Sequence, residues 1–431
     1  MLHLGLGNFF RAHQAWYTAA AGDGWDITAF TGRSPGMADL LNAQDCRYTL
    51  ITRGPAGDEA AVLRLAAAHA GDDRDAWLRE WTRPELAVVT LTVTEAAYAA
   101  SGRRGAVGSG AVGSGTVGSG TVGSGVAGSG VAGSGAVDLG SVPVRLAAGL
   151  AARRAAGGGP VAIVSCDNLP ANGSVTASVV TEAADPGLRR WIDGNVSFVT
   201  TMVDRITPAT TDDDRRAAAA LTGWADQAPV VTEPYAEWVL SGDFPAGRPA
   251  WENAGARFVA DVSAYEQRKL WMLNGGHTIL AYAGSLRGHV TVADAVADPY
   301  CRSLLDQWWD EASAGLPDGP SYRASLVERW SNARIEHRLA QIAADGSMKI
   351  PIRIVPVLLR ARAAGRMPEP GVQVLAAWIR HLRGESVPVA DAGAGPFAAA
   401  AGAGEPAGVL RRLDERLGAD RDLVAAVSDA L

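Results

Sequence analysis

Lysine is rare in this chain of 431 residues, and one lysine lies in a stretch that could carry out proton chemistry. Lys269 and Lys349 are the two lysines among 39 basic residues, and the others are arginine. An arginine keeps its proton in a protein, whereas a desolvated lysine can lose its proton near neutral pH and act as a general base. We therefore interpret Lys269 as a candidate base. The alternative is a lysine that survived by chance on a solvated face.

The residues around Lys269 supply the other groups that alcohol oxidation needs. Residues 265–277 are predicted to form a helix with 3.6 residues per turn, so Glu266 lies one turn before Lys269. Asn274 lies one turn before His277, which projects within roughly 80° of Lys269. An amine can take a hydroxyl proton while neutral donors steady the oxygen. The simpler alternative is an amphipathic helix in which Lys269 pairs with Glu266.

Residues 1–13 are expected to form a short apolar strand, a glycine turn and a helix, which is typical of dinucleotide binding. Gly5 allows the tight turn, and Gly7 lets a phosphate approach the helix N-terminus, where free N–H groups favour an anion. Asn8 and Phe9 open the helix and complete the predicted cofactor-binding turn. The third glycine of the fingerprint is absent. The alternative is a turn that binds nothing.

A second strand, over residues 26–31, follows at the distance expected of a βαβ unit. It is followed by Gly32-Arg33-Ser34, without the acidic residue that would hold the ribose hydroxyls of NAD. An arginine there can accept the extra phosphate of NADP. The sequence therefore predicts binding of NAD or NADP and favours NADP, although Arg33 could equally be a solvated loop residue.

Two further apolar runs, residues 86–95 and 160–168, are typical of strands buried on both faces of a parallel sheet. Polar residues close both runs. In open α/β sheets, ligands gather at the carboxyl ends of the strands, so these residues are candidates to line a site. They are Thr94, Glu95, Asp167 and Asn168. For Asp167, a helix cap or turn role is the favoured interpretation.

Six tandem pentapeptides of glycine, serine and small apolar residues occupy residues 106–135. Such a composition cannot bury enough apolar area to offset its ordering entropy, so we expect a flexible surface insertion. A stacked coil or self-association patch is the alternative. Residues 1–200 are predicted to be a Rossmann-type domain and residues 201–431 a mostly helical domain. The main predicted helices are residues 262–273, 278–286, 299–314, 322–330, 336–344 and 354–364.

Composition and charge narrow the class of protein. A net charge of -7 without a basic run argues against nucleic-acid binding. Three widely spaced cysteines suggest neither a disulfide framework nor a zinc site, so we expect no metal and a cytoplasmic location. We find neither a signal-peptide pattern nor an apolar run of membrane-spanning length, so no membrane association is expected.

Six ordered motifs resemble those of the mannitol dehydrogenase family, the polyol-specific long-chain dehydrogenases. The motifs are Gly-Leu-Gly-Asn-Phe-Phe-Arg-Ala-His at 5–13, residues 92–95, 165–173, 202–208 and 231–234, and Lys-Leu-Trp-Met-Leu-Asn-Gly-Gly-His at 269–277. The resemblance implies an α/β fold, with a Rossmann-type N-terminal domain and a mostly α-helical C-terminal domain. It also implies metal-independent hydride transfer in the cleft between them.

The same resemblance implies roles for individual residues. Lys269 is similar to the general base of the family, and Asn168 and Asn274 to the amides that stabilise the alkoxide. His277 is similar to the residue that orients the substrate oxygen, and Glu266 to a glutamate that relays the proton to solvent. Three further residues fall in segments that contact the substrate in relatives, namely Asp204, Arg338 and Lys349.

The sequence leaves the small-molecule substrate open. A free polyol or ketose, a hexuronate or hexonate, and a phosphorylated hexitol are all compatible with the motifs. The last would make the chain similar to mannitol-1-phosphate 5-dehydrogenase. A protein of another class, a non-catalytic sugar or nucleotide binder on a dehydrogenase scaffold, is a further alternative. Its signature would be loss of the catalytic residues, and Lys269, Asn274, His277 and Asn168 are all present.

Overall fold

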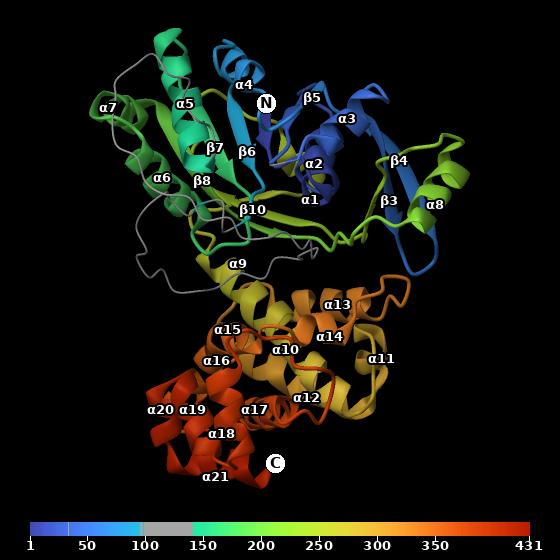
Figure 1. Ribbon diagram of the computed structural model, residues 1–431, viewed down its shortest axis with the longest axis vertical. Helices are drawn as coiled ribbons and strands as arrows, with labels where there is room; N and C mark the ends of the chain where they lie inside the picture. Colours follow the sequence, from blue (N-terminus) through green and yellow to red (C-terminus); the bar gives the residue numbers. More distant parts are fainter. Residues whose placement is uncertain (33, 95–97, 99–140) are drawn as a thin grey trace, which may run out of the picture.

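The computed structural model describes residues 1–32, 34–94, 98 and 141–431. Arg33, Glu95 and the repeat at 106–135 lie outside the described residues, so the predictions made for them stay predictions. The described chain forms a domain built on a parallel sheet, followed by a helical domain, with α9 (Ser263–Arg268) between the two in Figure 1.

The N-terminal domain is built on an eight-stranded sheet in the order β11-β10-β8-β7-β6-β1-β2-β5. Its strands are β1 (Leu2–Leu4), β2 (Thr28–Phe30), β5 (Ala67–His69), β6 (Val88–Leu91), β7 (Val161–Ser165), β8 (Val196–Asp204), β10 (Glu237–Ser241) and β11 (Arg257–Phe258). The six strands from β5 to β8 are parallel, and β10 pairs antiparallel with β8. Because β2 and β6 flank β1, the chain builds the sheet first to one side of β1, through β2 and β5, and then to the other side, through β6 and β7. The sheet therefore has its switch point between β1 and β6, where dinucleotides bind in this fold.

Helices cover both faces of this sheet, as its buried strands require. In β6, Val89 shares a hydrophobic cluster with Trp77, whereas the neighbouring Val88 shares a cluster with Tyr17 on the other face. Trp77 belongs to α4 and Tyr17 to α2. The covering elements are α1 (Asn8–Ala12), α2 (Gln14–Ala21), α3 (Gly36–Asn42), α4 (Arg74–Trp81), α5 (Val142–Ala155), α6 (Asn172–Ala183), α7 (Pro186–Asn195) and η2 (Trp251–Ala254). The α/β fold expected from the sequence is confirmed.

A second, three-stranded sheet lies at one side of this domain, in the order β4-β3-β9 (Figure 1). Its strands are β3 (Arg47–Arg53), β4 (Asp58–Arg64) and β9 (Val230–Thr232), and α8 (Asp212–Thr222) packs beside them.

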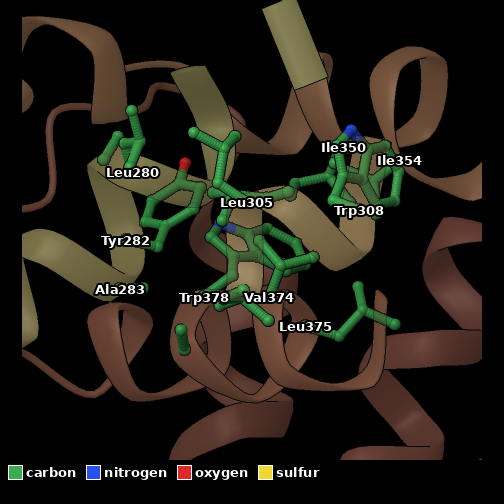
Figure 2. Close-up of a cluster of buried hydrophobic side chains, with 14 of the residues drawn as sticks. Leu280, Tyr282, Ala283, Leu305, Trp308, Ile350, Ile354, Val374, Leu375 and Trp378 are labelled. Carbon is green, nitrogen blue, oxygen red and sulfur yellow. The ribbon is translucent and has the colours of Figure 1, made fainter. Parts of the chain in front are cut away.

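The C-terminal domain is helical, as expected, and packs around buried tryptophans. Figure 2 shows Trp308 and Trp378 within this core. The helices are α9, η3 (Lys269–Asn274), α10 (Gly275–Ile279), η4 (Leu280–Gly284), α11 (Val292–Ala297), α12 (Pro299–Ala312), α13 (Gly319–Trp330), α14 (Leu339–Ala343), α15 (Gly346–Arg353), α16 (Val355–Ala363), α17 (Glu369–Leu382), α18 (Gly395–Gly402), α19 (Pro406–Leu413), α20 (Glu415–Ala419) and α21 (Arg421–Asp429). Among the described helices, none combines the length and apolarity needed to cross a bilayer.

Two predictions about the organisation of the chain are wrong. A boundary at residue 200 would cut through β8, and β10 and β11 also belong to the sheet, so the Rossmann-type domain extends to about Phe258. The predicted break between helices 262–273 and 278–286 is absent from the described chain. Residues 263–284 instead form one continuous helical segment that includes two π-helical stretches, η3 and η4.

Candidate active site

The turn after β1 leaves its backbone open, as a phosphate-binding turn requires. Gly5 has φ +114°, and a Cβ there would lie 2.0 Å from the carbonyl oxygen of Thr92. A Cβ on Gly7 would meet only the Gly5 carbonyl oxygen, at 3.6 Å, so Gly7 faces open space. This side-chain-free turn lies at the switch point of the sheet and precedes α1. The residues present therefore fit a dinucleotide whose pyrophosphate approaches Gly7.

The other predicted cofactor residues around this turn have different positions. Asn8 is half-buried and uses its side chain within the protein, because its Nδ2 donates to Thr210 Oγ1 at 3.2 Å. Phe9 is half-buried and stacks on His13 with ring centroids 5.0 Å apart. Thr94 is exposed beyond the end of β6. Of these three, Thr94 is the side chain left free to meet a bound cofactor from the described part of the site.

Lys269 and Asn168 meet across the two domains. The Nζ of Lys269 donates to Asn168 Oδ1 at 2.7 Å and to the carbonyl oxygen of Val203 at 2.7 Å. Asn168 follows β7, and Val203 lies near the end of β8, so both acceptors come from the carboxyl edge of the sheet. Burial lowers the pKa of Lys269, although the nearby carboxylate of Asp204 opposes the shift. The structure thus favours the neutral amine that a general base needs.

A cavity of about 260 Å³ surrounds this pair at the junction of the two domains. Segments 167–170 and 201–203 line it from the Rossmann-type domain, and residues of α9, η3 and α15 line it from the helical domain. It contains Lys269, Asn168, Asn274 and Glu266, which are four of the five predicted catalytic residues.

The π-helical geometry of η3 explains how Asn274 reaches the same cavity as Lys269. In an α-helix, side chains five residues apart project about 140° away from each other. The i→i+5 hydrogen bonding of a π-helix widens the turn and brings them close to the same direction. The indoles of α12 hold this segment in place, because Trp308 Nε1 donates to the Trp271 carbonyl oxygen at 2.8 Å and Trp309 Nε1 to that of Met272 at 3.0 Å.

Glu266 lines the cavity one turn before Lys269 but does not pair with it. Its Oε1 accepts a hydrogen bond of 3.1 Å from the amide of Ala171, which belongs to the other domain. Burial raises the pKa of Glu266. A carboxyl group whose pKa is raised toward neutrality is suited to exchanging protons, as the predicted relay requires.

Asp167 is also part of the cavity wall, which the turn interpretation did not foresee. Its carboxylate accepts hydrogen bonds from the amide of Val93 and from the hydroxyl of Tyr98, so it joins the ends of β6 and β7. Burial raises its pKa to about 7.

His277 is not among the residues that line the cavity, so its predicted contact with the substrate oxygen stays a prediction. Its side chain is 6% exposed and packs against Trp330, with ring centroids 4.6 Å apart and the rings tilted, and edge-on to His337 at 4.8 Å. Burial, reinforced by nearby basic groups, lowers the pKa of His277 well below its usual value, so the imidazole is neutral. Its Nε2 has no hydrogen-bond partner among the described residues.

The three predicted substrate-contacting residues also lie off the cavity wall. Asp204 is buried in an ion pair with Arg329 at 2.9 Å. Arg338 is exposed and pairs with Glu336. Lys349 is buried and donates to a backbone carbonyl oxygen at 3.1 Å, and burial lowers its pKa to about 8. Their contacts with a substrate stay predictions, since a charged residue near a functional motif can equally form an internal ion pair or face the solvent.

Sequence reasoning missed Arg353, which lines the cavity from the end of α15. It lies four residues after Lys349, so a helix through this segment places the two basic residues on the same face. That spacing was the available signal. In a chain rich in arginine, however, this spacing does not distinguish a functional arginine from the many others.

Two family models match the chain along most of its length. The mannitol dehydrogenase Rossmann domain matches residues 1–253, and the mannitol dehydrogenase C-terminal domain matches residues 261–415. Their junction agrees with the end of the sheet at β11.

Individual proteins give the same result. D-mannonate oxidoreductase of Escherichia coli K12 is 34% identical over 404 residues, which cover 89% of this chain and 80% of that protein. Mannitol 2-dehydrogenase of Cereibacter sphaeroides is 36% identical over 404 residues, covering 89% and 81%. Mannitol 2-dehydrogenase of Pseudomonas fluorescens, solved as a ternary complex with NAD and D-mannitol, superposes with a TM-score of 0.73 at 30% identity, covering 100% of this chain and 90% of that one. The chain therefore belongs to the mannitol dehydrogenase family of oxidoreductases.

Proposed function

We propose that this protein is an NAD(P)-dependent dehydrogenase that interconverts a secondary alcohol of a polyol or sugar acid with the corresponding ketone, with Lys269 as the general base. The observation that carries the proposal is the hydrogen bond of 2.7 Å between Lys269 Nζ and Asn168 Oδ1. The amine of this pair has a lowered pKa and lines a cavity at the carboxyl edge of the sheet. Asn168 follows β7, which lies two strands from β1 and its glycine turn.

The hydrogen bonds of Lys269 support its role as a base. A neutral amine has two N–H donors and one lone pair. Asn168 Oδ1 and the Val203 carbonyl oxygen, each 2.7 Å from Nζ, can accept both donors. The lone pair is then left for the proton of a substrate hydroxyl. Desolvation lowers the pKa of the amine, which favours the neutral form that can accept that proton.

The two amides complete the chemistry of the oxygen. Because Asn168 directs its Oδ1 to Lys269, its Nδ2 is free to donate to the alcohol oxygen as negative charge develops there. The side chain of Asn274 makes no hydrogen bond with the described residues and lines the same cavity, so it can donate a second one. Glu266, with its raised pKa, is placed to pass the proton from Lys269 toward solvent.

A nicotinamide dinucleotide would supply the hydride acceptor when bound, and Gly5 and Gly7 would form its pyrophosphate turn. The described residues at the end of β2, Thr31 and Gly32, offer no carboxylate for the ribose hydroxyls. We therefore propose NADP as the favoured cofactor, with Arg33 accepting its extra phosphate. The Pseudomonas relative was solved with NAD, which makes NAD the competing choice. Comparing kcat/KM for NAD and NADP decides this, and a strong preference for NAD contradicts the NADP proposal.

The function is tested by following reduction of NAD and NADP with a hexitol, a hexonate and a hexitol phosphate, and the reverse reaction with the matching ketoses. Turnover of at least one pair that responds to Lys269 variants is expected. Absence of hydride transfer with every substrate and both cofactors would contradict the proposal.

A cytoplasmic location is proposed as well. Cys46, Cys166 and Cys301 are buried free thiols, which fit a reducing compartment.

A further inference from the structure

Arg353 is a buried arginine that faces the cavity. It is the last residue of α15, is 3% exposed and contributes to the cavity wall beside Asn274. Its neighbours Ile350 and Ile354 are buried in the hydrophobic core with Trp308, as Figure 2 shows. These anchors fix the backbone on both sides of Arg353, and the buried side chain contributes to the cavity wall.

The guanidinium of Arg353 has few partners for a buried cation. Its Nη1 donates to Thr278 Oγ1 at 3.2 Å and to the Asn274 carbonyl oxygen at 3.4 Å, while Nε has no partner among the described residues. It forms no ion pair within the described chain. Burial lowers its pKa to about 10, which leaves it charged at neutral pH. A buried charge without a counter-ion is costly, so an anion bound beside it would be stabilised.

Two other buried arginines of the described chain have carboxylate partners. Arg329 pairs with Asp204 and Glu233, and Arg268 pairs with Glu237.

Arg153 has no carboxylate partner among the described residues, yet it donates to five backbone carbonyl oxygens and needs no ligand. Arg353 has neither a carboxylate partner nor such a set of carbonyl acceptors among the described residues. Lys349, four residues before Arg353 in α15, adds positive charge in the same region and also lacks an ion pair in the described structure.

Three charged groups of the cavity, Glu266, Lys269 and Arg353, follow the helical segment 266–274, while Asp167 adds a carboxyl group with a pKa of about 7 from the sheet edge. Glu266 stands one turn before Lys269, and Arg353 binds the backbone at Asn274, five residues after Lys269. The base therefore lies between an acidic end and a basic end. A substrate whose reacting hydroxyl meets Lys269 would place an anionic group at the Arg353 end and keep it away from Glu266.

We propose that Arg353 binds an oxyanion of the substrate, so that this enzyme acts on anionic sugar derivatives in preference to neutral polyols. The favoured anion is the carboxylate of a hexonate or hexuronate, whose planar pair of oxygens suits a guanidinium. A sugar phosphate offers the same charge chemistry. The proposal rests on the dehydrogenase function proposed above, and it adds the class of substrate.

The test compares kcat/KM for D-mannonate, D-mannitol and D-mannitol 1-phosphate in the wild type and in Arg353→Gln. A charge-assisted contact predicts that the wild type prefers an anionic substrate over D-mannitol by roughly tenfold to a hundredfold. In Arg353→Gln that ratio should collapse toward one. Arg353→Lys should retain part of this preference, because lysine keeps the positive charge but lacks the planar pair of N–H donors of a guanidinium.

Arg153→Gln is the matched control, since it also removes a fully buried guanidinium but lies far from the cavity in sequence and fold. It should lower thermal stability and leave the substrate ratio unchanged. A higher kcat/KM for D-mannitol than for both anions, or an equal loss for all substrates in Arg353→Gln, would overturn the proposal. A preference for D-mannitol 1-phosphate over D-mannonate would support the anion site and reject the carboxylate.

Failure of the proposed function gives a different result. If no substrate is turned over with either cofactor, binding can still be measured by titration calorimetry with D-mannonate. Tighter binding to the wild type than to Arg353→Gln then supports the anion site. Equal affinity, or no binding to either protein, overturns it.

Discussion

The amine of Lys269 lies 2.7 Å from the side-chain oxygen of Asn168, although 101 residues separate them in the sequence. One residue begins a π-helical stretch of the helical domain, and the other follows a strand of the Rossmann-type sheet. Their contact therefore depends on how the two domains pack. Any change that separates the domains should remove Lys269 from its acceptor before it unfolds either domain.

Asn168→Asp tests the electrostatics of this contact. A carboxylate at this position favours the charged form of Lys269 and so raises its pKa. Because the base must be neutral, the rise of kcat with pH for alcohol oxidation should move to higher pH by about one unit or more. The pH profile of kcat measures this. A profile that keeps its midpoint would show that Asn168 does not contact the titrating group.

Glu266→Gln tests the proton relay. The Glu266 carboxylate raises the pKa of Lys269, so its removal should let that pKa fall further and move the acid limb of the profile to lower pH. Loss of the relay should also lower kcat by about tenfold or more. The two effects distinguish a relay from a purely electrostatic role. If Glu266 acts only through its charge, Glu266→Gln should shift the acid limb of the pH profile without lowering kcat at high pH.

Gly5→Ala and Gly7→Ala test the cofactor turn as a matched pair. Gly5 has a positive φ, and its Cβ would overlap the Thr92 carbonyl oxygen, so Gly5→Ala should lower the melting temperature by several degrees. Gly7→Ala meets no such obstacle. It should keep its stability and weaken dinucleotide binding by roughly tenfold, or about 1.4 kcal/mol, because the methyl group occupies the path of the phosphate. Nucleotide titration and thermal unfolding check both, and unchanged affinity in Gly7→Ala would place the cofactor elsewhere.

Much of the fold could be predicted from local patterns. The apolar runs ending at residues 95 and 168 indicated buried parallel strands, and the topology of such sheets brings their polar ends together. The run of polar groups from Glu266 to Asn274 indicated one active face. These predictions needed only periodicity and strand order, and the matching family models confirm the resulting architecture.

The remaining features depend on contacts between distant segments, which periodicity does not report. His277 is buried because Trp330 and His337 pack against it from later helices. Asp204 is neutralised by Arg329 of α13, more than a hundred residues away in the sequence. The π-helical turn at Lys269–Asn274 is held by indoles of α12. The domain boundary was placed too early because β10 and β11 join the sheet after a long excursion through β9.

The most direct test of the account is the turnover of Lys269→Arg. Arginine keeps the positive charge but cannot lose its proton, so it cannot act as the base. We predict that kcat for alcohol oxidation falls by about a hundredfold to ten-thousandfold, as in Lys269→Ala, while affinity for the nicotinamide dinucleotide stays close to that of the wild type. A Lys269→Arg enzyme with a kcat within tenfold of the wild type would contradict the assignment of Lys269 as the base.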